Sequence, residues 1–188
     1  MRRVVLQMRI SVDGFVANLN GEEDWGVPPD DKVFNLIDSL PDKADTLLIG
    51  RKMAEGFIPH FENFPADHPK SAFAQKMVNL TKVIFSNTLT APFGKNATLA
   101  QGSLAATITE LKQADGKNIL VYGGANFVSA LIAGGHIDEF YLLVMPVMMG
   151  KGIRIFDLLE NRHALTLYTA KAFNNGISLL HYGLKHGA

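Results

Sequence analysis

The stretch that decides the fold is Asn118-Ile119-Leu120-Val121-Tyr122-Gly123-Gly124-Ala125-Asn126-Phe127. Its first five residues are mostly apolar and predict a short buried strand. The two glycines predict a tight turn, because glycine has no side chain to restrict the backbone or to keep a ligand away. Beyond them, apolar residues recur at helical spacing up to Gly134-Gly135, which predicts a helix over residues 125–133. This strand–turn–helix unit is typical of an α/β protein.

Two further turns follow predicted strands in the same way. Gly50-Arg51-Lys52 places a glycine and two cations at the start of a helix, where unpaired backbone N–H groups favour an anion. Ser86-Asn87-Thr88 offers three short polar side chains after Val83-Ile84-Phe85. The carboxyl ends of parallel strands meet at one edge of an open α/β sheet, and ligands bind there. The three turns together therefore favour a dinucleotide site.

Each turn on its own also has a purely structural interpretation. A glycine after a strand is often simple turn geometry, Arg51 and Lys52 could be solvated, and Ser86 and Asn87 could form a cap. The sequence also lacks a Gly-x-Gly-x-x-Gly fingerprint after its first predicted strand. Cations, rather than an acidic residue for the ribose 2′-hydroxyl, favour the 2′-phosphate of NADP.

The rest of the chain alternates between predicted strands and helices. Strands are expected at 4–10, 46–49, 82–86, 118–122 and 137–145, and helices at 31–40, from 51, at 71–80, 104–114 and 125–133. Residues 57–69, with three prolines, are expected to be irregular. Asn174-Asn175-Gly176 predicts a hairpin between strands at 165–173 and 177–185. We therefore expect a single domain over residues 1–188, with helices on both faces of a mixed, mainly parallel sheet that ends in an antiparallel hairpin.

Composition limits the classes of function. The 188 residues are 47% hydrophobic, and 18 Lys and Arg balance 18 Asp and Glu. A nucleic-acid-binding protein usually carries a basic excess, so nucleic acid is not an expected partner. The absence of cysteine excludes disulfides, zinc–thiolate sites and cysteine nucleophiles, and the cytoplasm is the expected location.

Membrane and metal sites are not expected either. No apolar run is long enough to span a bilayer, and Gln7, Arg9 and Asp13 interrupt the amino-terminal apolar run too early for a signal peptide. The six histidines are scattered, with no metal-ligand spacing. We therefore expect a soluble protein without a metal centre.

The order and spacing of five short strings give the chain a family resemblance. They are Ser11-Val12-Asp13-Gly14-Phe15-Val16-Ala17, Leu48-Ile49-Gly50-Arg51-Lys52, Val83-Ile84-Phe85-Ser86, Val121-Tyr122-Gly123-Gly124 and Pro146-Val147-Met148-Met149-Gly150-Lys151-Gly152. Over nearly its whole length the chain resembles the dihydrofolate-reductase-like superfamily, and within it the carboxyl-terminal reductase domain of the bifunctional riboflavin-biosynthesis deaminase-reductases. The resemblance implies the dihydrofolate-reductase-like α/β/α fold and NADPH as cofactor. Deamination is not expected, because the deaminase needs a zinc site with cysteine ligands.

The resemblance also implies where NADPH would bind. Arg51 and Ser86 would hold its 2′-phosphate end, and the glycine pair, which relatives often join by a cis peptide, would lie against the pyrophosphate. Residues 13–25 would form a mobile loop over the nicotinamide. The full set of cofactor-binding residues implied in this way is Ala17, Ile49, Gly50, Arg51, Lys52, Ser86, Asn87, Gly123, Gly124, Ala125, Asn126 and Phe127.

Three residues upstream of the first predicted helix are candidates for the substrate side. In dihydrofolate reductases a Trp, a Pro and an acidic residue recur with spacing similar to that of Trp25 and Asp30, and the acid helps to protonate the pterin ring. The resemblance therefore makes Asp30 the catalytic and substrate-binding candidate, although Asp30 is equally well placed as a helix N-cap. Trp25 would line the substrate pocket or simply pack. Asp13 would orient the loop or only terminate the first strand.

The expected activity is that of an NADPH-dependent reductase acting on a small nitrogen heterocycle or its ribosylamino derivative. Within the family, the expected activity resembles that of 5-amino-6-(5-phosphoribosylamino)uracil reductase. The sequence, however, shows no dedicated cluster of residues for the phosphate of such a substrate. A dihydrofolate or pteridine reductase and a non-catalytic NADP-binding protein of the same fold are the alternatives. Residues 140–149 and the hairpin would form either core or the interface of a homodimer.

Overall fold

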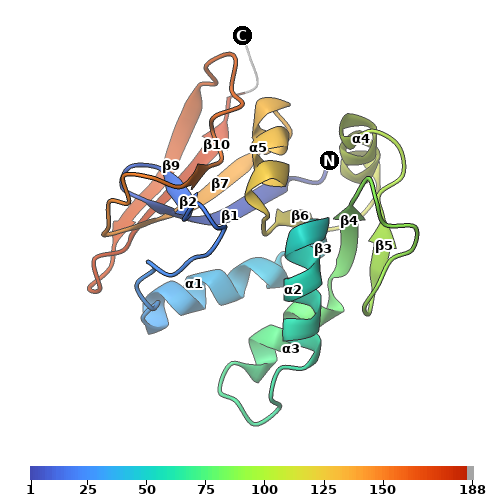
Figure 1. The fold of residues 1–188 in the computed structure, drawn as a ribbon, viewed down its shortest axis with the longest axis horizontal. Helices are drawn as coiled ribbons and strands as arrows, with labels where there is room; N and C mark the ends of the chain where they lie inside the picture. The colour runs from blue at the N-terminus through green and yellow to red at the C-terminus, as the bar shows by residue number, and fades with distance from the viewer. Residues whose placement is uncertain (186–188) are drawn as a thin grey trace.

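A mixed sheet, mainly parallel, lies at the centre of the protein (Figure 1). The computed structural model describes residues 1–185, and the strands of this sheet are β1 (Val4–Ser11), β3 (Ala44–Gly50), β4 (Thr81–Phe85), β5 (Ala97–Leu99), β6 (Asn118–Val121), β7 (Glu139–Met145), β9 (Leu165–Ala172) and β10 (Ser178–Leu184). Their order is β5-β4-β3-β6-β1-β7-β10-β9. The pairs from β5 to β7 are parallel, and β10 is antiparallel to both of its neighbours.

Helices cover both faces of this sheet (Figure 1). In residues 1–185 they are α1 (Asp31–Asp42), α2 (Arg51–Glu62), α3 (Ser71–Asn79), α4 (Leu104–Gln113) and α5 (Ala125–Ala133). Ile108 of α4 and Leu131 of α5 belong to the core on one face. Phe57 of α2 and Met77 of α3 belong to the core on the other face, where α1 also packs. The expected α/β/α fold with an antiparallel hairpin is confirmed.

Strand β1 lies in the middle of the sheet and directs alternate side chains to the two faces. Leu6 packs in the core shared with α4 and α5, and Val5 packs in the core shared with α2 and α3. Gln7 and Arg9 have the same parity as Val5, so they lie on the face covered by α1, α2 and α3. Two polar side chains are thus placed on the inner face of a central strand.

Residues 57–62 are helical, and the expectation of an irregular segment from residue 57 was wrong there. Helix α2 continues through Pro59, and the N–H of Asn63 donates to the Pro59 carbonyl at 3.0 Å. Phe57 is buried, and its ring packs at 4.6 Å from that of Phe61. Burial of these rings outweighs the single helical hydrogen bond that a proline removes.

Three short strands were missed by the pattern analysis. One is β5, and the other two, β2 (Phe15–Ala17) and β8 (Ile153–Arg154), pair with each other in a separate antiparallel sheet. Within residues 1–185, no helix is long and apolar enough to cross a membrane.

Candidate active site

The three turns identified in the sequence lie side by side. Strands β4, β3 and β6 are neighbours and run parallel, so their carboxyl ends share one edge of the sheet. The turn after β3 contacts the turn after β6 directly, because the N–H of Gly50 donates to the Gly123 carbonyl at 3.3 Å. The fold therefore brings together the groups for which a dinucleotide site was predicted.

Glycine is required at two positions of this edge. Gly123 has a φ of +137°, which side chains rarely allow. A Cβ on Gly50 would lie 3.1 Å from the Cβ of Phe127, which is tighter than ordinary van der Waals contact. The resemblance implied a cis peptide between Gly123 and Gly124, but residues 1–185 contain no cis peptide bond. The close approach of α5 to β3 thus depends on glycine, and the peptide itself is trans.

Helices α2 and α5 both begin at this edge with glycine as the N-cap. Gly50 and Gly124 provide no side-chain hydrogen bond to the first turn, so the leading backbone N–H groups of both helices have no side-chain acceptor. Such helix starts favour an anionic ligand. Ala125 and the exposed Asn126 are the first two residues of α5.

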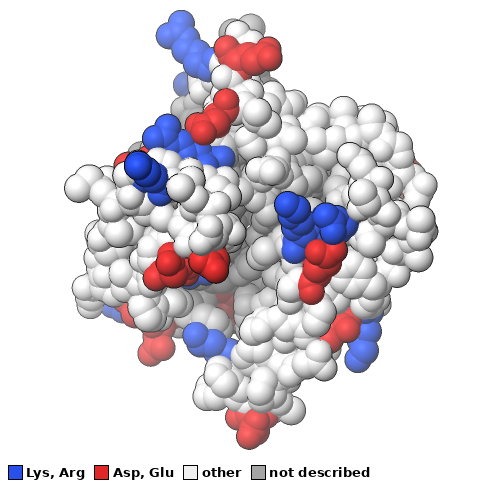
Figure 2. All heavy atoms as spheres, viewed as in Figure 1, with Lys and Arg blue, Asp and Glu red and all other residues white. Residues whose placement is uncertain are grey.

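Positive charge gathers over the start of α2, beside a hollow in the surface (Figure 2). Lys52 is exposed, and among the described residues it makes no ion pair. The Arg51 guanidinium lies 2.7 Å from the Glu55 carboxylate. Because both side chains are substantially exposed, this ion pair is weak and Arg51 can exchange partners.

Most of the other cofactor candidates have side chains that are packed inside the protein or, in Ser86, hydrogen-bonded within the turn itself. The Ser86 hydroxyl accepts hydrogen bonds from the N–H groups of Thr88 and Leu89, at 3.1 and 2.9 Å, and so closes the turn after β4, while Asn87 is exposed. The side chains of Phe127, Ile49 and Ala17 are directed into packed regions of the protein. Only their main chains are therefore available to a ligand.

Asp13 connects two distant segments. Its carboxylate accepts from the Ser11 hydroxyl at 2.6 Å and from the N–H groups of Met149 and Gly150, the latter at 2.7 Å. These hydrogen bonds lower the pKa of Asp13 to about 2. The turn after β1 is thereby fastened to the segment after β7.

Asp30 and Trp25 lie close to the start of α1. The Asp30 carboxylate accepts from the N–H of Val33 at 2.9 Å and is the N-cap of α1. Trp25 is partly buried against the core cluster that includes Met145. Its indole N–H is buried and has no hydrogen-bond partner within residues 1–185. Neither residue, nor Asp13, lines the cleft described next.

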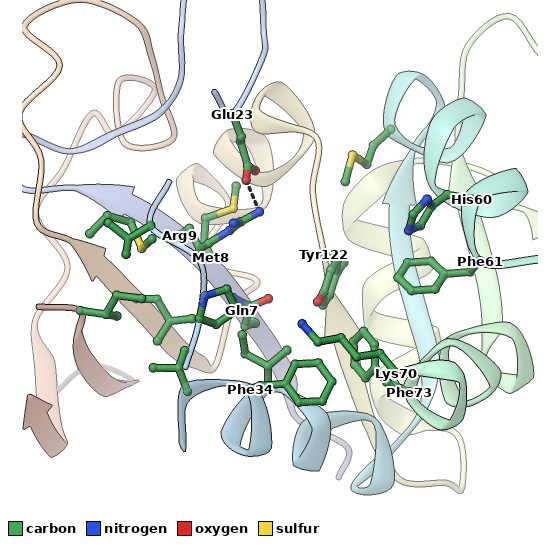
Figure 3. A pocket seen from close by; sticks show the side chains of 18 of the residues that line it. Gln7, Met8, Arg9, Glu23, Phe34, His60, Phe61, Lys70, Phe73 and Tyr122 are labelled. Carbon is green, nitrogen blue, oxygen red and sulfur yellow. Dashed lines mark ion pairs between the residues drawn. The ribbon is translucent and has the colours of Figure 1, made fainter. Parts of the chain in front are cut away.

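A cleft of about 380 Å³ opens between α1 and α2, above β1 (Figure 3). This volume is at the lower end of the range for small-molecule sites, about 300–1,000 Å³, and suits a small ring system rather than a whole dinucleotide. Apolar and aromatic side chains form most of its walls. The aromatic ones are Phe34 from α1, His60 and Phe61 from α2, Phe64 from the following loop, Phe73 from α3, and Tyr122 directly after β6.

A few polar groups enter this cleft, and pattern analysis did not find them. They are the Gln7 amide, the Tyr122 hydroxyl, the Lys70 ammonium group and an ion pair between Arg9 and Glu23 (Figure 3). The available signal was the alternation in β1, where Gln7 and Arg9 interrupt a row of apolar residues on one face. Within residues 1–185, His, Asp and Glu side chains nowhere gather in threes that could hold a metal ion.

The cleft and the glycine turns adjoin each other. Tyr122 lines the cleft and directly precedes Gly123-Gly124. Met53, in the first turn of α2, also lines the cleft, and its side chain would lie 3.6 Å from a Cβ on Gly123. Burial within the cleft raises the pKa of Tyr122 to about 12, so its hydroxyl keeps its proton. A ring-sized cleft thus borders the edge at which the two glycine-capped helices begin.

Known proteins share both the sequence pattern and the fold. Residues 2–179 match the family model of the RibD C-terminal domain. The uncharacterized protein YyaP of Bacillus subtilis is 31% identical over 185 residues, covering 96% of this chain and 94% of YyaP. A solved structure from Shewanella sp. PV-4, provisionally assigned to riboflavin biosynthesis, has a TM-score of 0.76 at 24% identity and covers 98% of this chain and 99% of its own.

A larger solved structure shares the fold over part of its length. The diaminohydroxyphosphoribosylaminopyrimidine deaminase/5-amino-6-(5-phosphoribosylamino)uracil reductase of Thermotoga maritima has a TM-score of 0.70 at 17% identity. The match covers 97% of this chain and 56% of the Thermotoga chain.

Proposed function

Because the chain belongs to the RibD C-terminal domain family, we propose that it is an NADPH-dependent reductase that transfers hydride to a small nitrogen heterocycle or its ribosylamino derivative. The resemblance noted in the five sequence strings is confirmed at the level of the family. The fold is that of RibD-like reductase domains. The cofactor and the acceptor are assigned from the site described above.

The turn edge supports NADPH as the cofactor. When bound, NADPH supplies the hydride from its nicotinamide ring. The glycine-capped starts of α2 and α5 would hold the pyrophosphate through backbone N–H groups that lack side-chain acceptors. Arg51 would exchange Glu55 for the 2′-phosphate, and Lys52 would contribute a second positive charge.

The shared wall between the cleft and the turns is the observation that carries the proposal. A ring held in the cleft would lie against Met53 and Tyr122, next to the backbone of Gly123-Gly124. Hydride transfer needs two carbons held in contact and shielded from water. The aromatic walls of the cleft exclude water, and its few polar groups orient the ring.

Substitution at Arg51 tests the cofactor assignment. We expect Arg51→Ala to weaken NADPH binding by about ten-fold or more, because charge-assisted hydrogen bonds to the 2′-phosphate are lost. NADH binding should change little. Glu55→Gln is the matched control, since it removes the competing carboxylate and should leave NADPH binding equal or tighter. Equal losses for NADPH and NADH in Arg51→Ala, measured by calorimetry, would refute the assignment.

Turnover separates a reductase from a binding protein. We expect NADPH absorbance to fall in the presence of the enzyme and an acceptor from a panel of ribosylaminouracil phosphate, free ribosylaminouracil and dihydropterins. Tight NADPH binding without oxidation by any acceptor would favour the non-catalytic alternative.

A further inference from the structure

Gln7 is a buried polar residue whose side chain has no hydrogen-bond partner in the described part of the chain. Its exposed fraction is 6%, and its side-chain amide makes no hydrogen bond within residues 1–185. The amide nevertheless lines the cleft, and Figure 3 shows it directed into the cavity. Leu6 pairs with Val121 in the parallel register of β1 and β6, so the next residues along, Gln7 and Tyr122, are neighbours at the floor of the cleft.

This placement is unfavourable for the fold alone. The face of β1 on which Gln7 lies is otherwise apolar beneath the helices, since Val5 is 2% exposed and belongs to the core. The amide gains no hydrogen bond from the described part of the protein, and its atoms are not among the buried unsatisfied ones, because they open on the cleft. Gln7 is therefore poorly explained as a structural residue and well explained as a residue that faces a ligand.

The two polar groups that meet at the cleft floor, Gln7 and Tyr122, are uncharged, whereas the Lys70 ammonium group and the Arg9–Glu23 ion pair are the charged groups of the same cleft. A glutamine amide donates through Nε2 and accepts through Oε1, and the protonated Tyr122 hydroxyl adds a further donor or acceptor. Of the carboxylates in the described residues, only Glu23 reaches the lining, and it is paired with Arg9. The carboxylate that the resemblance to dihydrofolate reductases implied, Asp30, is instead engaged as the N-cap of α1.

We propose that Gln7 is the specificity-determining residue of the cleft, and that its amide, with the Tyr122 hydroxyl beside it, selects an uncharged planar heterocycle that presents a donor and an acceptor side by side. The inference rests on the proposed function, because it concerns the acceptor of the same reductase site. A cationic ring is disfavoured, because the Glu23 carboxylate is already paired with Arg9 and the Lys70 ammonium group adds positive charge to the cleft. The acceptor is bound in its neutral form.

A matched pair of ligands tests this inference. Lumazine is a planar lactam with N–H groups beside carbonyl groups, and 1,3-dimethyllumazine has the same ring with both N–H donors blocked. We expect the wild-type protein to bind lumazine about ten-fold or more tightly than the dimethyl compound in a fluorescence titration, because two hydrogen bonds are at stake. In Gln7→Leu the affinities for the two ligands should agree within about two-fold.

The stability of the variant provides the control for folding. We expect the Tm of Gln7→Leu to be unchanged or a few degrees higher, since an unpaired amide has been replaced by an apolar side chain. A fall in Tm would indicate a structural role for Gln7 and would contradict the inference. Tyr122→Phe is the second variant, and it should reduce the preference for lumazine without abolishing it.

Besides a fall in Tm, three results of the titrations would overturn the inference: the wild-type protein does not discriminate between the ligands, neither ligand binds at about millimolar concentration, or Gln7→Leu still prefers lumazine. These titrations contain no NADPH and require no turnover. If the ligand titrations contradict the role of Gln7 but NADPH still binds, the proposed function stands. Discrimination between the ligands without any NADPH binding would instead refute the proposed function and leave the role of Gln7 in ligand binding intact.

Discussion

Asp13 fastens the turn after β1 to the segment after β7 through a single carboxylate. Three donors, the Ser11 hydroxyl and the N–H groups of Met149 and Gly150, stabilise its charged form. The pKa of Asp13 is lowered from 3.8 to about 2 by these bonds. A carboxylate whose pKa is lower in the folded state than in the unfolded state stabilises the fold above its unfolded pKa.

The pH dependence of Asp13→Asn follows from this shift. We expect the variant to be less stable than the wild type at neutral pH, because Asn accepts these hydrogen bonds less strongly than a carboxylate does. The difference in the free energy of unfolding should shrink as the pH falls from about 4 to about 2, where Asp13 itself becomes protonated. Urea unfolding across that range measures it, and a difference independent of pH would contradict the role of the charge.

Asp30 shows how one carboxylate can satisfy two interpretations of a sequence. Its position before α1 fits both an acid catalyst and an N-cap, and its hydrogen bond to the N–H of Val33 establishes the cap. We expect Asp30→Ala to lose about 1 kcal/mol of stability and Asp30→Asn to lose little, because Asn is also a good N-cap. If capping is the whole role of Asp30, both variants retain reductase activity. A general-acid role stays a prediction, and it would be supported if Asp30→Asn lost activity at an unchanged Tm.

At the scale of elements, the end of α3 depends on a buried lysine from the next strand. Lys82 of β4 is 2% exposed, and its ammonium group donates to the carbonyls of Val78 and Leu80 at 2.7 and 2.8 Å. These carbonyls lie at the end of a helix, where no backbone donor is available. Burial lowers the pKa of Lys82, because it disfavours the charged ammonium form. The hydrogen bonds to these carbonyls offset that cost and hold the polar head group in this position.

Replacement of Lys82 should therefore loosen α3. We expect Lys82→Met to reduce the free energy of unfolding by about 1–3 kcal/mol, because the Leu80 carbonyl loses the ammonium donor and the Val78 carbonyl keeps only Asn96, while the apolar stem is retained. Lys32→Met, at an exposed position of α1, is the control and should change stability by less than about 0.5 kcal/mol. Equal effects of the two substitutions in urea unfolding would contradict a capping role.

The elements that the sequence predicts well are those whose signals are local. Residues 125–133 form a helix as expected, because the glycine pair before it and the apolar stripe within it lie in one short stretch. The end of α2 was missed, since packing of Phe57 and Phe61 against distant residues overrides the local signal of Pro59. Strands β2 and β8 exist only through pairing with each other, across more than a hundred residues, and neither carries a pattern of its own.

The candidate site likewise has one part that local sequence signals predict and one part that only the fold assembles. The three turns were predictable because each follows its own strand, and the sheet order then places them together. The cleft was not, because Gln7, Lys70 and Tyr122 come from segments far apart in the sequence and meet only when α1 and α2 are spaced across β1 and β6. The only sign of the cleft in the sequence was the presence of polar residues in a central strand.

For the molecule as a whole, β9 forms one edge of the sheet and is exposed along its entire length. Leu167 and Tyr168 are 51% and 50% exposed on this strand. Long, exposed, apolar edge strands are prone to pair with other chains, which favours the homodimer interface over the core as the role of the hairpin, the two alternatives that the sequence left open. We expect sedimentation to give twice the chain mass of 20.5 kDa for the wild type and the single mass for Leu167→Lys. A wild-type monomer at high concentration would contradict this expectation.

Cofactor binding by the whole, unmodified protein tests the central claim most directly. Trp25 is the only tryptophan in the sequence, and NADPH absorbs in the range in which tryptophan emits, so binding can be followed as loss of tryptophan emission. We expect saturable quenching by NADPH at a concentration about ten-fold or more below that needed with NADH. Quenching by neither nucleotide at about millimolar concentration, or equal affinity for both, would contradict it.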